Sequence, residues 1–284
     1  MKEILIDAFK DSIALVPFLF LIFLILEVFE KYFSDKIFKI TRFCTKSGPL
    51  LGSIAAAIPQ CWLSVIAATL YVKKYITKGT LIAIFISTSD EAVPVLLANP
   101  DKVSVVLPLV ITKIIIGICA GYLIDFVSKE PLKHDCAEFE IEEKGCCHHE
   151  ISTHDKKLLL IHPLKHTLNI FVFIFFVTLF LNFLVAKAGD NLSAIFLQNS
   201  ILQPLAASVI GLIPNCAISV LITMLYIKGV ISFGSVIAGL SAGAGLGLIV
   251  LFKKNSNLKD TLNIIFILIA ISTICGIAMN LLNL

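Results

Sequence analysis

Charge is scarce in this 284-residue chain, because only 15% of its residues are charged while 58% are hydrophobic. The mean hydropathy is +0.96. A soluble core of this size uses fewer apolar residues, so the composition excludes an ordinary soluble protein and predicts a polytopic, all-α membrane protein. The first residues, MKEILIDAFKDS, contain acids and lack a small-residue cleavage pattern. We therefore expect no removable signal peptide.

The chain also lacks a glycine-rich phosphate-binding loop followed by Lys-Ser or Lys-Thr, which argues against ATP hydrolysis. No histidine lies within an apolar segment, which weakens the alternative of a membrane-embedded thiol enzyme that needs a base. The net charge of +3 says little about partners, since the lysines lie in loops where they report topology. We expect no nucleic-acid partner.

Long apolar segments recur along the chain. Two of them are interrupted by proline, which removes a backbone N–H and breaks a helix. The interrupted segments are 47–72, with Pro59, and 202–227, with Pro214. The others approach the ~20 residues that cross a bilayer as a helix, and they lie at about 12–33, 80–98, 103–127, 167–186, 235–252 and 261–284.

The two interrupted segments are copies of each other. SIAAAIPQCWLSVIAATLYVKKYITKGTLIA (53–83) and SVIGLIPNCAISVLITMLYIKGVISFGSVIA (208–238) align without gaps at an offset of 155 residues, and the same offset pairs Gly121 with Gly276. Shared hydrophobicity alone does not align Pro, Cys, Tyr and Lys together. The sequence therefore predicts a first repeat at 1–128, a polar insert at 129–162 and a second repeat at 163–284.

The positive charges predict how the repeats cross the membrane. If each interrupted segment enters and leaves on the same side, 17 lysines and arginines lie on one side and five on the other, with Lys113 left out. This is a clear positive-inside pattern, whereas continuous spans give none. We expect two inverted repeats, each with a re-entrant or broken helical hairpin. The termini are predicted outside an inner membrane and the insert in the cytoplasm.

The hairpin tips are candidates for a binding site. Broken helices at depth are tolerated where they are buried in protein or line a wet cavity, and paired breaks in inverted repeats are typical of a transporter's substrate site. The tips offer freed carbonyls, amides and soft sulfurs. The alternative is a proline-kinked span with packed cysteines. The tip residues are Pro59, Gln60 and Cys61 in the first repeat and Pro214, Asn215 and Cys216 in the second.

The segment IFISTSDEAVPVLL (84–97) carries hydroxyls and adjacent carboxylates inside an apolar span. Ionisable groups at that depth are expensive and are usually functional. We expect Ser87 and Ser89 to bind substrate, and Asp90 and Glu91 to take part in ion coupling. Lys113 is either their structural counter-ion or part of a proton relay. The equivalent segment of the second repeat carries no charge.

The insert concentrates soft and borderline metal ligands, while its spacing matches no zinc finger. We expect a flexible loop that binds metal transiently, with no tightly bound cofactor. The alternative for its backbone is a disordered charged linker. The candidate ligands are His134, Cys136, Cys146, Cys147, His148, His149 and His154.

The duplicated halves, the Pro-Gln-Cys and Pro-Asn-Cys tips, the Ser-Thr-Ser-Asp-Glu segment and the His/Cys insert resemble the ten-transmembrane heavy-metal exporters, a family often labelled arsenic efflux proteins. The resemblance implies export of a heavy metal or metalloid. We predict a secondary transporter, with a proton or other ion as the coupling partner. A membrane thiol enzyme, a transporter of a non-metal solute and a passive channel are the alternatives. The oligomeric state stays open.

Overall fold

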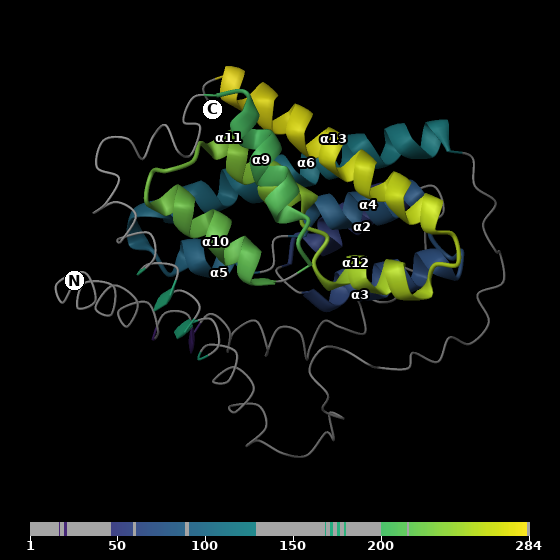
Figure 1. The fold of residues 1–284 in the computed structure, drawn as a ribbon, viewed down its shortest axis with the longest axis horizontal. Coiled ribbons are helices and arrows are strands. Elements are labelled where there is room, and N and C mark those ends of the chain that lie inside the picture. The colour runs from purple at the N-terminus through teal and green to yellow at the C-terminus, as the bar shows by residue number, and fades with distance from the viewer. Residues whose placement is uncertain are drawn as a thin grey trace, which may run out of the picture.

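The computed structural model describes residues 47–58, 61–88, 91–128, 200–214 and 216–282, with a few isolated positions near 17–21 and 168–179. Within these residues every regular element is helical, which confirms the predicted all-α class (Figure 1). The first repeat contributes α2 (Gly48–Ala56), α3 (Cys61–Val72), α4 (Lys78–Ser87), α5 (Ala92–Leu97), the 3₁₀ turn η1 (Pro100–Lys102) and α6 (Val103–Val127). The second contributes α9 (Leu202–Gly211), α10 (Cys216–Ile227), α11 (Phe233–Ala242), α12 (Leu246–Lys254) and α13 (Leu258–Leu281).

The helices repeat at the offset of 155 residues found in the sequence. α3 and α10 have the same bounds after this shift, and so do α4 and α11. The helix ends repeat as well. Thr77 caps α4 by accepting a hydrogen bond from Thr80 N, and Ser232 caps α11 by accepting one from Ser235 N. Such caps satisfy backbone donors that a helix start leaves free.

The turns after α3 and α10 share one geometry. Lys74 has φ +64° and Gly229, its equivalent, has φ +72°. Tyr75 N donates to Leu70 O and Val230 N donates to Leu225 O, both at 2.9 Å. This is the Schellman ending of a helix, for which glycine is the usual residue at the left-handed position.

Within the part of the chain that the structure describes, four helical stretches are long and apolar enough to cross a membrane: Lys78–Leu97, Val103–Val127, Phe233–Lys254 and Leu258–Leu281. The stretch containing α4 and α5 is almost wholly buried, whereas most residues of α6 and α13 are partly buried or exposed. Their exposed side chains are large and apolar, for example Leu107, Phe126 and Phe266. Such a surface suits lipid, which supports the polytopic assignment.

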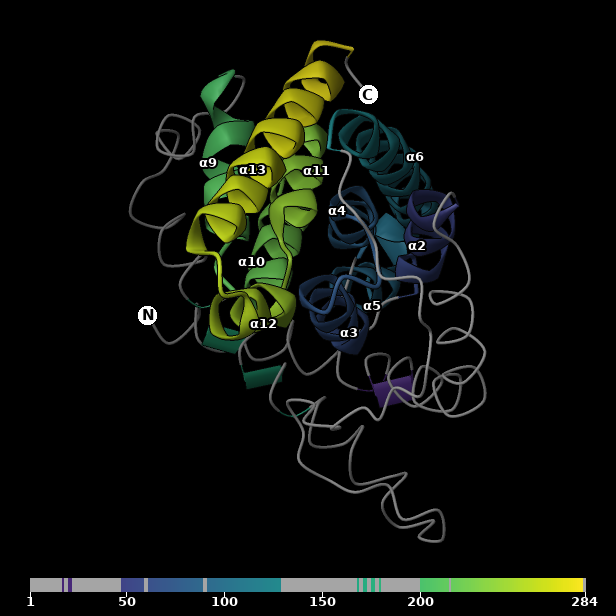
Figure 2. The same ribbon diagram turned by 90° about the vertical axis from the view of Figure 1, so that its right-hand side faces the viewer.

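The helices of the two halves pack in the same arrangement, and each half also contacts helices of the other half. α4 contacts α2 and α6, as α11 contacts α9 and α13. Figure 2 shows these two triplets on opposite sides of the molecule. α3 packs against α12 of the other half, and α10 packs against α5. The fold is therefore held together by reciprocal contacts between the repeats.

α4 and α6 approach closely at glycines. A Cβ atom on Gly79 would overlap the Gly121 carbonyl oxygen, and one on Gly234 would overlap the Gly276 carbonyl oxygen. Side-chain-free positions let helix backbones approach in this way. These pairs explain why Gly79 and Gly121 recur 155 residues later in the sequence.

The long helices run in opposite directions. Asp125, near the end of α6, accepts hydrogen bonds from Thr77 Oγ1 at 2.7 Å and Gly79 N at 2.9 Å. Asp260, in the first turn of α13, lies at this same end of the molecule, because it pairs with Lys78 at 2.7 Å. We call this the Asp260 end.

The opposite end is marked by Lys102, just before α6, whose Nζ lies 5.3 Å from the centre of the Tyr226 ring. We call it the Lys102 end. α6 has 25 residues and is therefore about 37 Å long. It runs from the Lys102 end to the Asp260 end, whereas α13 starts at the Asp260 end and runs the other way.

Candidate functional site

Each half contains two interruptions of its apolar segments. The first is the one predicted at the Pro-x-Cys motifs, where α2 ends at Ala56 and α3 begins at Cys61, and α9 ends at Gly211 and α10 begins at Cys216. The second was not predicted. The segment expected to cross as one helix at 80–98 is divided into α4 and α5, and its equivalent is divided into α11 and α12.

Backbone chemistry accounts for the second pair of breaks. Gly245, between α11 and α12, has φ +52° and ψ −141°, which residues with side chains rarely adopt. In the first half, Thr88 leaves the helical region, with ψ 130°. Its hydroxyl bonds back to Ile84 O at 2.7 Å, competing with continuation of the helix.

Lys113 joins the two halves at these breaks. Its side chain is completely buried, and its ammonium group donates to Thr88 O at the end of α4 and to Leu240 O in the last turn of α11, the latter at 3.0 Å. Helix ends leave carbonyls unsatisfied and carry partial negative charge. One cation on α6 thus binds the carboxyl ends of broken helices from both repeats. The equivalent of Lys113 in the second half is Leu268, a buried core residue.

Small hydroxyl side chains surround this junction. Ser87 Oγ lies 3.4 Å from Lys113 O, on the backbone of α6. A Cβ on Gly117 would overlap Ser87 Oγ and would lie 2.8 Å from Ser53 Oγ, so both hydroxyls lie next to a residue without a side chain. Ser241, next to Leu240, is also fully buried. In the described part of the chain, Ser53 Oγ and Ser241 Oγ have no hydrogen-bond partner.

Residues near the Pro-x-Cys interruptions lie beside the second pair of breaks. A Cβ on Gly211, at the end of α9, would overlap the carbonyl oxygen of Gly239 in α11. A Cβ on Gly247, in the first turn of α12, would lie 2.6 Å from Ser64 O in α3 and 2.8 Å from the Phe85 ring in α4. The helix ends next to all four interruptions therefore come from both repeats and pack together in the interior.

The structure describes some of the predicted site residues, and others lie outside the described ranges. Ser87, Glu91 and Lys113 are buried, Glu91 directly before α5, and Pro214 is partly buried after α9. Cys61 and Cys216 begin equivalent helices. Pro59, Gln60, Ser89, Asp90 and Asn215 lie outside the described residues, and so do all seven candidate ligands of the insert. Within the described ranges no group of three or more metal-ligating side chains occurs. The roles assigned to these residues remain predictions.

Sequence reasoning missed the backbone partners of Lys113 and the buried Ser53 and Ser241. Two signals were available. Ser53 is one of the identities at the offset of 155 residues, and the run Gly-Ala-Gly at 243–245 is a local helix breaker.

A family profile described as "Putative, 10TM heavy-metal exporter" matches the chain over residues 1–186 and 167–283. The chain belongs to this family. The predicted resemblance is thereby confirmed. No curated protein and no solved structure matches the chain.

The described helices account for eight of the ten segments that the family's description names. If α2, α3, α9 and α10 each count as one segment, and each broken span counts as one, every half supplies four segments. The fifth predicted segment of each half, at 12–33 and 167–186, falls outside the described ranges apart from isolated positions.

Proposed function

We propose that this protein is a secondary transporter that exports a heavy metal or metalloid, and that its substrate binds between broken helices of two inverted repeats. The observation that carries the proposal is the junction at Lys113, where helix breaks from both halves meet around one buried cation. Family membership supplies the class of cargo. Broken helices facing each other across a repeat interface are typical of substrate and ion sites in secondary transporters.

Contacts at the two ends of the molecule support re-entrant hairpins. α2 starts beside α4, since a Cβ on Gly48 would overlap Thr80 Oγ1. α3 ends at the same Asp260 end, where Tyr71 Oη donates to Asp260 Oδ2 at 2.8 Å. The segment 47–72 thus begins and finishes at one end, with half-helices of nine and 12 residues. These are about 14 and 18 Å long, shorter than a bilayer core.

The second hairpin enters from the opposite end. Gln203, in the first turn of α9, accepts hydrogen bonds from Ser232 N at 3.1 Å and Ser235 Oγ at 2.8 Å. Tyr226, near the end of α10, faces Lys102. Both ends of the segment 202–227 therefore belong to the Lys102 end. Together with the opposite directions of α6 and α13, this supports inverted repeats.

The tips then carry the chemistry of cargo binding. Cys61 and Cys216 supply one soft sulfur from each repeat, which suits a soft metal cation or a thiol-binding metalloid. Gln60 and Asn215 supply amide groups, and Pro59 and Pro214 leave carbonyls free. Ser87 and Ser89 add hydroxyls from the segment that follows α4.

Asp90 and Glu91 are the proposed proton-coupling groups. A carboxylate inside a membrane protein can take up and release a proton only if it can ionise. Lys113 holds the adjacent helix ends and so places a positive charge close to this segment. The insert, with His134 to His154, is proposed to bind metal transiently in the cytoplasm, and the Asp260 end is the cytoplasmic end by the lysine distribution.

Cellular accumulation tests the proposal. Cells that produce the protein should retain less of at least one member of a panel containing arsenite, zinc, cadmium and copper than cells that produce a Lys113→Met, Glu91→Gln double variant at the same level. Equal retention of every panel member, with both proteins present in the membrane, would contradict metal export. Efflux of a non-metal solute instead would keep the transporter architecture and reject the cargo.

A further inference from the structure

Three lysines gather at the Asp260 end, where α12 ends and α13 begins. Lys253 and Lys254 lie in the last turn of α12, and Lys259 lies in the first turn of α13. All three are exposed, and in the part of the chain that the structure describes none of them forms an ion pair. The neighbouring acid, Asp260, is already paired with the buried Lys78 at 2.7 Å. This lysine cluster therefore carries positive charge that the protein does not neutralise.

An exposed apolar stripe on α13 begins beside the lysine cluster. The stripe consists of Leu258, Leu262 and Phe266, whose spacing of four residues places them on one face of the helix. Their exposed fractions are 58%, 52% and 70%, and the exposed Phe252 precedes the cluster. α13 is long and apolar enough to cross a membrane. Positive charge followed by a hydrocarbon surface is the complement of an anionic lipid, whose charged headgroup continues into acyl chains.

α6 presents the equivalent stripe without the lysine cluster. At the offset of 155 residues the stripe consists of Val103, Leu107 and Ile111, which are also exposed. The positions equivalent to the three lysines hold Ala98, Asn99 and Ser104. The lysine next to this stripe, Lys102, directly follows Asp101, and its Nζ lies 5.3 Å from the centre of the Tyr226 ring. The two stripes are thus similar in apolar character and different in charge.

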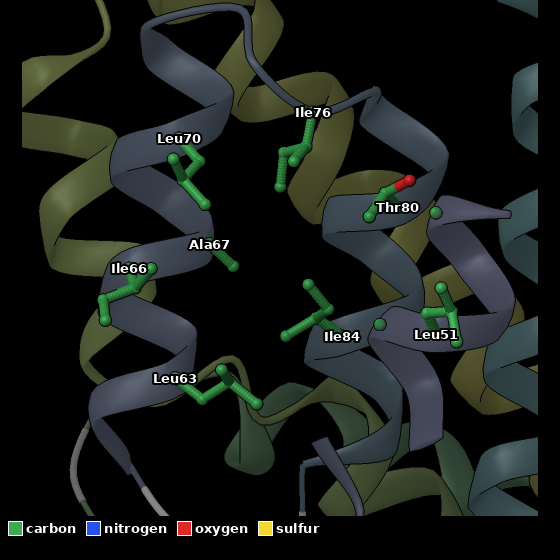
Figure 3. A pocket seen from close by; sticks show the side chains of 10 residues that line it. Leu51, Leu63, Ile66, Ala67, Leu70, Ile76, Thr80 and Ile84 are labelled. Atoms are coloured by element: carbon green, nitrogen blue, oxygen red, sulfur yellow. The ribbon is translucent and has the colours of Figure 1, made fainter. Parts of the chain in front are cut away.

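The lysine cluster does not line the pocket found at the same end. This pocket lies between α3 and the helices α2 and α4, and its lining is apolar apart from Thr80 (Figure 3). The three lysines are not among the residues that form it. The cluster is therefore a feature of the membrane-facing surface and not the mouth of this pocket.

We propose that the start of α13 is a binding site for an anionic phospholipid, with the headgroup phosphate against the lysine cluster and the acyl chains along the α13 stripe. Lysine ammonium groups bind phosphate as point charges. Each basic residue close to a membrane surface strengthens the attraction to anionic lipid about fivefold. The equivalent stripe on α6 binds anionic and zwitterionic lipids alike. The inference needs only the membrane assignment and holds for any cargo.

Fluorescence quenching by brominated lipid tests the site in the full-length protein. Trp62, which is the single tryptophan of the chain, is first replaced by phenylalanine. Leu262→Trp then places a reporter on the α13 stripe, and Leu107→Trp places the matched reporter on α6. The proteins are reconstituted in phosphatidylcholine nanodiscs that contain a rising fraction of brominated phosphatidylglycerol. Both leaflets have the same composition, so a difference between the reporters comes from the protein.

The Leu262→Trp reporter should reach half-maximal quenching at a phosphatidylglycerol fraction at least about fivefold lower than the Leu107→Trp reporter. Replacing the three lysines of the cluster with glutamine should make the two fractions equal. Lys228→Gln, which removes an exposed lysine at the opposite end, should leave both fractions unchanged. Brominated phosphatidylcholine should quench both reporters alike.

Equal fractions for the two reporters in the protein that keeps its lysines would overturn the site, and so would a difference that survives in the glutamine variant. If inorganic phosphate, compared with chloride at the same ionic strength, abolishes the difference, the cluster binds free phosphate and the lipid assignment is wrong. Should Leu262→Trp fail to insert, Phe266→Trp and Ile111→Trp form the second matched pair and decide in the same way.

Discussion

Replacing Lys113 with methionine removes the ammonium group that bridges the two repeats while keeping a long side chain. The group donates to Thr88 O and Leu240 O in a fully buried position. An unsatisfied buried polar group costs about 1–3 kcal/mol, so two freed carbonyls cost roughly 2–6 kcal/mol. The methionine recovers part of this, because a desolvated cation is itself expensive to bury. We expect a net loss of about 2 kcal/mol or more.

Equilibrium unfolding of purified protein by SDS titration in mixed micelles measures this loss. Leu268→Met, at the equivalent position of α13, is the matched control and should cost less than about 1.5 kcal/mol, because similar-sized apolar residues exchange with little strain. A Lys113→Met variant as stable as the Leu268→Met variant would refute the bridge. The carbonyls would then be satisfied without the lysine.

Three further substitutions and one deletion test the packing and the insert. Gly79→Ala should destabilise the protein by about 1–3 kcal/mol or more in the same titration, because its Cβ would overlap the Gly121 carbonyl oxygen. Lys74→Gly should stabilise it by about 0.5–1 kcal/mol and Gly229→Lys should do the opposite, since both positions have positive φ. Deleting residues 135–154 should lower zinc binding, measured by calorimetry, while vesicle transport continues; loss of transport from a normally inserted protein would place the insert in the transport path.

The duplication was the most informative feature of the sequence. The offset of 155 residues predicts which helices of the two halves share the same bounds. Chemically distinctive residues, such as glycine, tyrosine and proline, made the offset recognisable. Gly79 and Tyr71 recur with their partners because they form helix crossings and inter-repeat contacts, which tolerate few replacements. The hydrophobic residues between them differ between the two halves, since many apolar side chains suit the same apolar environment.

The division of the spans at 80–98 and 235–252 could not be predicted by hydropathy. A broken helix and a continuous one contain equally apolar residues, and the interruption at Thr88 depends on a carbonyl that Lys113 satisfies from 25 positions away. Every residue has a backbone carbonyl, so the amino-acid composition does not indicate which carbonyl accepts a hydrogen bond from a distant side chain. For the same reason the sequence did not indicate that Lys113 also donates to the carbonyl oxygens of Thr88 and Leu240.

Sided metal flux into proteoliposomes tests the central claim most directly. Wild-type protein should transport arsenite or a soft metal cation, and Cys61→Ser and Cys216→Ser should each lower that flux at least tenfold, because serine keeps the size and loses the soft donor. Cys119→Ser on α6 and Cys275→Ser on α13 are the controls, since these free cysteines lie on the long outer helices, and they should transport like wild type. Undiminished flux in both tip variants would contradict a soft-metal site between the two repeats.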